Sequence, residues 1–187
     1  MSATHSSSLA LVWQLAQFEA RHLNASSLEP THLLLGLCKI VDLDLAALIS
    51  KNAPDRDVLL EESLREVRKL RTVFRTAGVD AKLLRRSLRT SHPERRFELD
   101  ESDRIRRNPA AKRVFADAEH LAELSGVVVY PVHLLYASLL AEDEHRDTTM
   151  ATLGIEKKRF LTVAKRQVGL PALDAASGSK GPRPRWN

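Results

Sequence analysis

The chain has 187 residues and a formal net charge of +5, with 43% hydrophobic, 28% charged and 5% aromatic residues. This length suits one domain with a sizeable core, and the composition is that of a helix-rich globular protein. No apolar run approaches the roughly 18 residues that a membrane span needs, and residues 1–8 lack the features of a signal peptide. We therefore expect a cytoplasmic protein that does not enter a membrane.

Apolar periodicity and helix-capping residues predict about eight helices and no sheet of consequence. Pro30 and the Asn108-Pro109 pair open two of them, whereas Gly78 ends another. In chain order, helices are expected over about 9–23, from Pro30 onward, and over about 42–50, 55–76, 80–88, 110–125, 131–141, 145–153 and 156–168.

One stretch occurs twice. Pro30-Thr31-His32-Leu33-Leu34 is followed 101 positions later by Pro131-Val132-His133-Leu134-Leu135, and the same offset pairs Leu28 with Val129. Two copies of one unit usually stack so that each covers the apolar face of the other. The sequence therefore predicts an all-α fold in which a four-helix repeat is duplicated about a pseudo-twofold axis.

The expected domain covers residues 1–170. Repeat one runs over about 9–90, a linker over about 91–107 and repeat two over about 108–168. The distance from His32 to Gly78 is about 25 residues longer than that from His133 to Gly154, which places an insertion at about 44–68 in repeat one. Residues 171–187 are rich in Gly, Pro, Ser and Ala and are predicted to form a disordered tail.

The inserted segment predicts an amphipathic helix. Its apolar stripe must be buried, or else it should mediate self-association; the stripe comprises Leu60, Leu64, Val67, Leu70 and Phe74. A basic face lies opposite, and residues 51–90 carry a net charge equal to that of the whole chain. The basic face comprises Arg65, Arg68, Lys69, Arg71 and Arg75.

Such a face is most often simply solvated, and otherwise it binds an acidic protein or nucleic acid. Nucleic-acid binding would be better supported by aromatic residues among the basic ones, yet only Phe74 is present and it falls on the apolar stripe. A protein partner is therefore favoured, with a basic nucleic-acid-binding regulator as the alternative.

His32 and His133 each lie in the first turn of a predicted helix. No second His, Cys or carboxylate stands at ligand spacing beside either one, so we interpret both as structural residues that hold the preceding connection. No nucleophile–base pair or glycine-rich phosphate loop is recognisable. We expect no metal, no cofactor and no enzymatic activity.

Several of these segments resemble a known family. Residues 15–23 and 31–37 are similar to the first Clp repeat of the N-terminal domain of Clp unfoldases; residues 108–114, 133–135 and 153–155 are similar to the second. The resemblance implies a non-catalytic domain that recruits adaptors, substrates or small regulators to a protein-unfolding ring. No segment resembles the ATPase module that normally follows, so the chain is either a stand-alone protein or a piece of a larger one. The Met1 start and the basic end favour a stand-alone protein, expected to be a monomer or weak dimer.

Some members of that family bind phosphorylated arginine. In them, a Glu before the His of each repeat pairs with the guanidinium, and a Thr at the start of the first helix contacts the phosphate. Here Thr31 and Val132 occupy the Glu positions, and approximately Ser6 and Asn108 the Thr positions. Leaving a buried guanidinium unpaired costs about 3–5 kcal/mol. We therefore expect this binding to be lost, with partners held instead by the groove between the repeats and the basic face.

Overall fold

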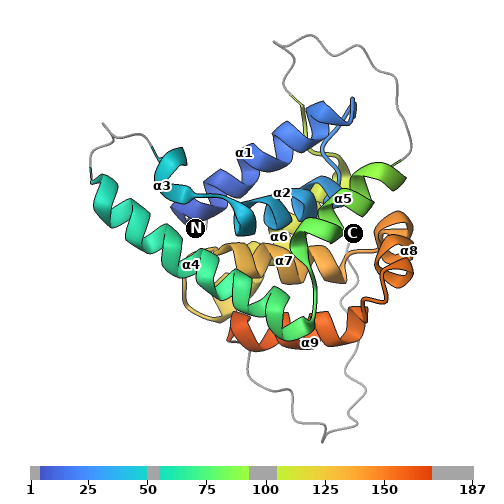
Figure 1. Ribbon diagram of the computed structural model, residues 1–187. Coiled ribbons are helices and arrows are strands. Elements are labelled where there is room, and N and C mark those ends of the chain that lie inside the picture. Colours follow the sequence, from blue (N-terminus) through green and yellow to red (C-terminus); the bar gives the residue numbers. More distant parts are fainter. Residues whose placement is uncertain (1–4, 50–54, 93–104, 170–187) are drawn as a thin grey trace, which may run out of the picture.

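The computed structural model describes residues 5–49, 55–92 and 105–169, and all regular elements in these ranges are helices (Figure 1). The all-α prediction is confirmed, and the predicted tail (171–187) and most of the predicted linker (93–104) lie outside the described residues. The nine helices of the described ranges are α1 (Ser7–His22), α2 (Pro30–Asp42), α3 (Leu45–Leu48), α4 (Arg56–Ala77), α5 (Ala81–Ser91), α6 (Pro109–Leu124), α7 (Pro131–Leu140), α8 (Glu144–Thr152) and α9 (Lys157–Val168).

The helix starts follow from local capping chemistry. A side-chain oxygen at the N-cap accepts a hydrogen bond from a backbone N–H of the first turn, which would otherwise lack a partner. Ser6 caps α1 through the N–H of Leu9, at 3.4 Å, and Asn108 caps α6 through the N–H of Ala111, at 2.8 Å. Gly78 ends α4 with a φ of 75°, a conformation that favours glycine.

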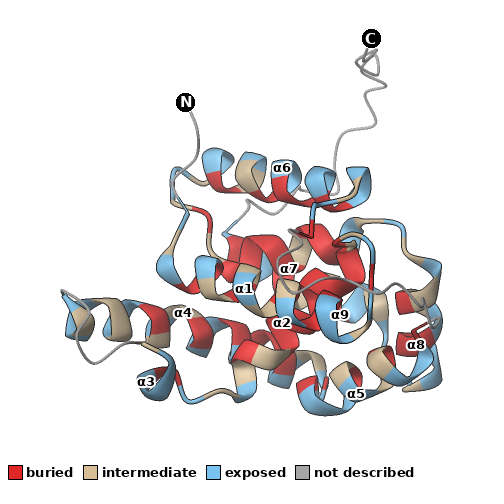
Figure 2. Ribbon diagram, turned by 90° about the horizontal axis from the view of Figure 1, so that it is seen from above, coloured by how far each residue is buried: buried red, intermediate tan, exposed pale blue. Residues whose placement is uncertain are grey.

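Helices α2 and α7 form the centre of the molecule (Figures 1 and 2), and most of their residues are buried. They pack against each other, α2 also packs against α1 and α5, and α7 also packs against α6 and α9. The crossing of α1 and α2 depends on Gly36. A Cβ atom there would lie 2.8 Å from the carbonyl oxygen of Val12 and 2.9 Å from the nitrogen of Ala16.

The segments that precede the paired helices are joined reciprocally. Before α1, the N–H of Ser6 donates to the carbonyl of Val129, which precedes α7, at 3.1 Å. Before α6, the N–H of Asn108 donates to the carbonyl of Leu28, which precedes α2, at 3.0 Å. This exchange is what a repeat about a twofold axis predicts, and the duplication itself stays a prediction from the sequence.

Helix α4 contains the C-terminal part of the predicted insertion in one continuous helix. Along its apolar stripe, Val67, Leu70 and Phe74 are buried, and Leu60 and Leu64 pack against the core. The rings of Phe74 and Phe160 lie edge to face at 5.2 Å, which joins α4 to α9. The stripe is therefore covered within the chain, and the alternative in which it stays exposed and drives self-association is wrong.

Candidate functional site: a pocket and a groove on either side of His5

The five cations of the basic face all lie on the exposed side of α4. Arg65 forms an exposed ion pair with Glu61 at 3.2 Å. Arg71 is engaged differently, because its Nε donates to the carbonyl of Val41 at 2.8 Å and so links α4 to the last turn of α2. Arg65, Arg68, Lys69 and Arg75 are thus the cations of this face that are available to a partner.

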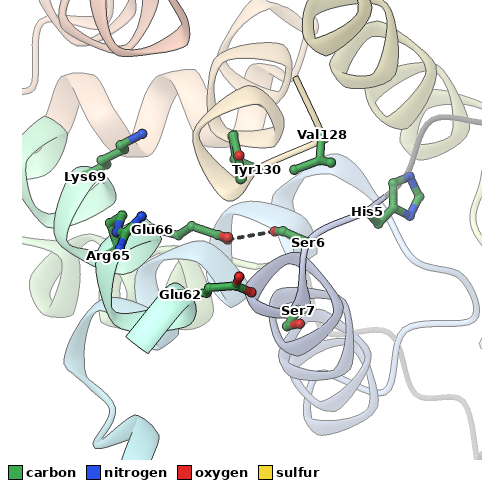
Figure 3. Close-up of a pocket in the computed structure, with 9 residues that line it drawn as sticks. All are labelled: His5, Ser6, Ser7, Glu62, Arg65, Glu66, Lys69, Val128 and Tyr130. Atoms are coloured by element: carbon green, nitrogen blue, oxygen red, sulfur yellow. Dashed lines mark hydrogen bonds between the residues drawn. The ribbon is translucent and has the colours of Figure 1, made fainter. Parts of the chain in front are cut away.

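A pocket of about 470 Å³ opens where α4, the start of α1 and the connection before α7 meet (Figure 3). We call it the α4 pocket. Lys69 and Arg65 lie on its α4 side, Tyr130 and Val128 come from the connection before α7, and a hydrogen bond between α1 and α4 lies near its centre. The α4 pocket is lined by His5, Ser6, Ser7, Glu62, Arg65, Glu66, Lys69, Val128 and Tyr130.

That hydrogen bond involves Glu66, a residue that sequence reasoning missed. Its Oε2 accepts a hydrogen bond from the hydroxyl of Ser6 at 2.7 Å and another from the hydroxyl of Ser8. Because the N-terminus of a helix carries partial positive charge, the carboxylate stabilises α1. Ser6, the predicted phosphate-side residue, is therefore committed to an acidic side chain of the chain itself.

The other predicted ligand positions are also used internally. Thr31 and Val132 are buried, and the hydroxyl of Thr31 donates to Oδ2 of Asp143 at 2.5 Å. Asn108 is held by its capping bond. Asp143 brings a carboxylate to Thr31 from a helix start far away in the sequence, and no local pattern indicates this pairing. Among the described residues, no three His, Cys, Asp or Glu side chains are grouped to hold a metal ion.

The two histidines of the duplicated stretch have the same local role. Glu29 N–H donates to Nδ1 of His32 at 3.0 Å, and Tyr130 N–H donates to Nδ1 of His133 at 2.9 Å. Each imidazole therefore closes the first turn of its helix on the preceding connection. Burial, together with the positive charge of Lys69, lowers the pKa of His133 from 6.5 to about 4.

This pKa predicts an acid-sensitive contribution to stability. Between pH 4 and 6.5 the unfolded chain binds a proton at His133 that the folded chain does not, so the stabilisation is complete above pH 6.5 and falls as the pH drops towards 4. The loss is at most about 3 kcal/mol, at 1.36 kcal/mol for each pKa unit. Urea unfolding at pH 7, 6 and 5 should show a shallower pH dependence for His133→Gln than for the wild type; parallel profiles would contradict the assignment.

A groove lies along α1, beside α6 and the segment that precedes it, on the other side of His5. It consists of two cavities, of about 310 and 620 Å³, that share Trp13, and we call it the aromatic groove. The Trp13 and Phe115 rings lie edge to face at 5.5 Å. The first cavity is lined by His5, Leu9, Ala10, Trp13, Arg107 and Phe115, and the second by Trp13, Gln17, Arg21, Ile105 and Arg106.

The α4 pocket and the aromatic groove lie next to each other, because His5 lines both. The His5 ring is fixed by Glu119, whose Oε1 lies 3.0 Å from Nε2. The two lie in a row from α4, past the start of α1, towards α6, and we call this row the track. Its mixture of charged and apolar walls suits an extended chain better than a compact small molecule.

None of the described helices is long and apolar enough to cross a membrane. No family model matches the sequence, and no curated protein is significantly similar to it. Comparison with solved structures is informative. The chain superposes on a chain from structural work on a malarial protein secretion system with a TM-score of 0.60 and 17% identity, covering 88% of this chain and 95% of the other.

Two further solved structures have the same fold. The N-terminal domain of Hsp104 from Candida albicans gives a TM-score of 0.57 at 18% identity, covering 86% of this chain and 89% of that domain. The N-terminal domain of the caseinolytic protease associated chaperone ClpD from Arabidopsis thaliana gives 0.55 at 16% identity, covering 88% and 96%. The chain therefore has the fold of these Clp and Hsp104 N-terminal domains, as the sequence resemblance implied.

Proposed function

We propose that this chain is a non-catalytic protein-interaction module of the Clp protease and unfoldase system, which acts as an adaptor, a regulator or a substrate-recruitment domain. The shared fold supports the class of protein. The observation that supports the proposal is the track of α4 pocket and aromatic groove, which lie on either side of His5, with the basic face along one end. Its partners are a Clp ATPase, the adaptors of that ATPase or its substrate proteins.

Nucleic acid is the second candidate, and the basic face favours it. Against it, no aromatic ring lies on the exposed side of α4, and Lys69 is already directed to a ring, with its Nζ 5.5 Å from the centre of Tyr130. A salt-sensitive shift of labelled duplex or single strand would favour this second candidate.

Charge reversal on α4 tests the proposed role. In the triple variant Arg65→Glu, Arg68→Glu and Lys69→Glu, capture of Clp components from the source lysate should fall about tenfold or more, because attraction to an acidic surface becomes repulsion. The melting temperature should stay within about 2 °C of the wild type, since exposed charges contribute little to stability. Capture is measured by quantitative mass spectrometry and stability by calorimetry.

The matched control reverses three exposed cations elsewhere, Lys82, Arg86 and Arg166. It changes the net charge equally but leaves α4 intact, so capture should be retained. An equal loss in both variants would mean that only net charge matters, and unchanged capture in the α4 variant would reduce the basic face to a solvated surface.

Because the carboxylates of Glu66 and Asp143 already accept hydrogen bonds within the chain, we expect no binding of free phosphoarginine. At the start of α1, Glu66 would repel a phosphate from Ser6. Near α2, the carboxylate of Asp143 beside the buried Thr31 already accepts hydrogen bonds from the Thr31 hydroxyl and the N–H of Arg146, so it is not free for a guanidinium. Isothermal titration calorimetry should detect no binding at millimolar concentration, with arginine as the control ligand. Micromolar binding by the unmodified protein would contradict this account of the site.

A further inference from the structure

The floor of the aromatic groove is apolar and well ordered by packing. Leu9, Ile105 and Phe115 are at most 7% exposed, yet each contributes to a cavity wall. Trp13 stands between the two cavities and is only partly buried. An apolar side chain that entered the first cavity, of about 310 Å³, would lose water against Trp13 and Phe115.

The rim of the groove carries positive charge. The guanidinium centre of Arg107 lies 4.9 Å from the centre of the Phe115 ring and 5.5 Å from that of Trp13, a cation–π arrangement that fixes its place. Arg106 lines the second cavity. Within the described ranges, neither Arg106 nor Arg107 forms an ion pair with a carboxylate. The nearby carboxylate of Glu119 contacts the His5 imidazole instead.

Two guanidinium groups beside an apolar floor are complementary to a ligand that carries carboxylates beside an apolar group. A carboxylate can accept two parallel hydrogen bonds from each guanidinium, whereas a cation would be repelled. A nucleic-acid base fits less well, because Arg107 already lies over the rings on which a base would stack. A peptide needs no free ring face, since its apolar side chain can pack against ring edges.

We infer that the aromatic groove binds an acidic peptide segment in which an apolar side chain is flanked by carboxylates: the apolar group enters the cavity beside Trp13, and the carboxylates pair with Arg106 and Arg107. This inference rests on the proposed function, which makes the chain a protein-interaction module, and names the partner chemistry of one part of its track. The basic face of α4 lies outside the groove and can be tested separately.

Fluorescence anisotropy with synthetic peptides tests the inference. The probe is a labelled 12-residue peptide of alternating Leu and Glu with one central Phe. Two matched peptides replace every Glu by Lys, or every Leu and Phe by Ser, and a single-stranded 12-mer oligonucleotide is the fourth probe. The acidic apolar peptide should bind at least about tenfold more tightly than the other three. It alone has apolar side chains for the floor of the groove and carboxylates for the guanidinium groups of the rim.

Substitution should locate the binding site. Arg107→Gln should weaken binding of the acidic apolar peptide about tenfold, and Arg107→Lys should weaken it less, since it keeps the charge but loses the planar fork. Arg106→Gln is the second test of the rim, and Arg113→Gln, on the exposed side of α6, is the control that should have no effect. Circular dichroism confirms that each variant is folded.

Equal binding of the lysine peptide, tighter binding of the oligonucleotide, or indifference to both Arg106→Gln and Arg107→Gln would overturn the inference. Its failure can be told from failure of the proposed function. If the peptide does not bind but Clp components are captured through α4, only the partner chemistry of the groove is wrong. If the peptide binds as expected and no Clp component is captured, the groove assignment holds and the proposed function fails.

Discussion

Gly36→Val should lower the free energy of unfolding by about 3 kcal/mol, the upper end of the usual cost of overpacking a core. In a chain of this length, each kcal/mol of lost stability lowers the melting temperature by about 2–4 °C. The melting temperature of Gly36→Val should therefore fall by about 6–12 °C. The reason is specific. Any Cβ at residue 36 would meet the backbone of Val12 and Ala16, and backbone atoms cannot rotate away as a side chain can.

Ala116→Val is the matched control for this prediction. Residue 116 is exposed on α6, so valine there costs only the weaker helix preference of a β-branched side chain, about 0.5 kcal/mol. Thermal unfolding of both variants by calorimetry makes the comparison. A similar, small loss in the two would show that α1 and α2 can move apart freely, which would contradict the close crossing at Gly36.

Arg146→Leu should cost about 3 kcal/mol, the second large effect. The guanidinium is completely buried and donates to the carbonyls of Ser138 and Ala141 at the end of α7, and to Oδ1 of Asp147 at 2.7 Å. Leucine would fill part of the space but would leave both carbonyls without a donor. It would also remove one of the two cations at Asp147, the other being Lys157 at 2.6 Å.

Arg71→Leu is the natural comparison, because Arg71 serves the end of α2 in a similar way from an exposed position. Water can replace its hydrogen bonds, so the expected cost is only about 1 kcal/mol. Urea denaturation of both variants measures the difference. If Arg146→Leu were no worse than Arg71→Leu, the buried guanidinium would not be the main anchor of α8 on α7.

The sequence predicted what depends on neighbouring residues. Helix starts at Pro30 and Asn108 followed from capping chemistry, and Gly78 marked an end, because each such signal acts within one turn. The duplicated Pro–x–His–Leu–Leu stretch correctly marked the two central helices, since only fully buried helices tolerate such continuous apolar runs.

The candidate site was less predictable, because it is assembled from residues far apart in the chain. Glu66 lies 60 positions from Ser6, and the sequence alone does not distinguish it from the other acidic residues on the surface of α4. Trp13, Arg107 and Phe115 look like isolated residues in the sequence, and only the packing of α1 against the segment before α6 brings them together. For Arg71, charge alone could not distinguish a free cation from one that holds a helix end.

Helix α4, which contains part of the predicted insertion, supplies the side chains that surround the start of α1. It covers the start of α1, places the carboxylate of Glu66 against it, and places Arg65 and Lys69 around the resulting pocket (Figure 3). We expect this combination, rather than the common fold, to decide which proteins the chain binds.

Affinity capture from the source lysate, with the tagged full chain as bait and proteins identified by mass spectrometry, tests the central claim most directly. We expect a Clp ATPase, one of its adaptors or its substrates to be enriched by the wild type and to decrease with the triple α4 variant. Absence of every Clp component from the wild-type capture, or enrichment of nucleic-acid complexes that nuclease treatment removes, would contradict the proposed function.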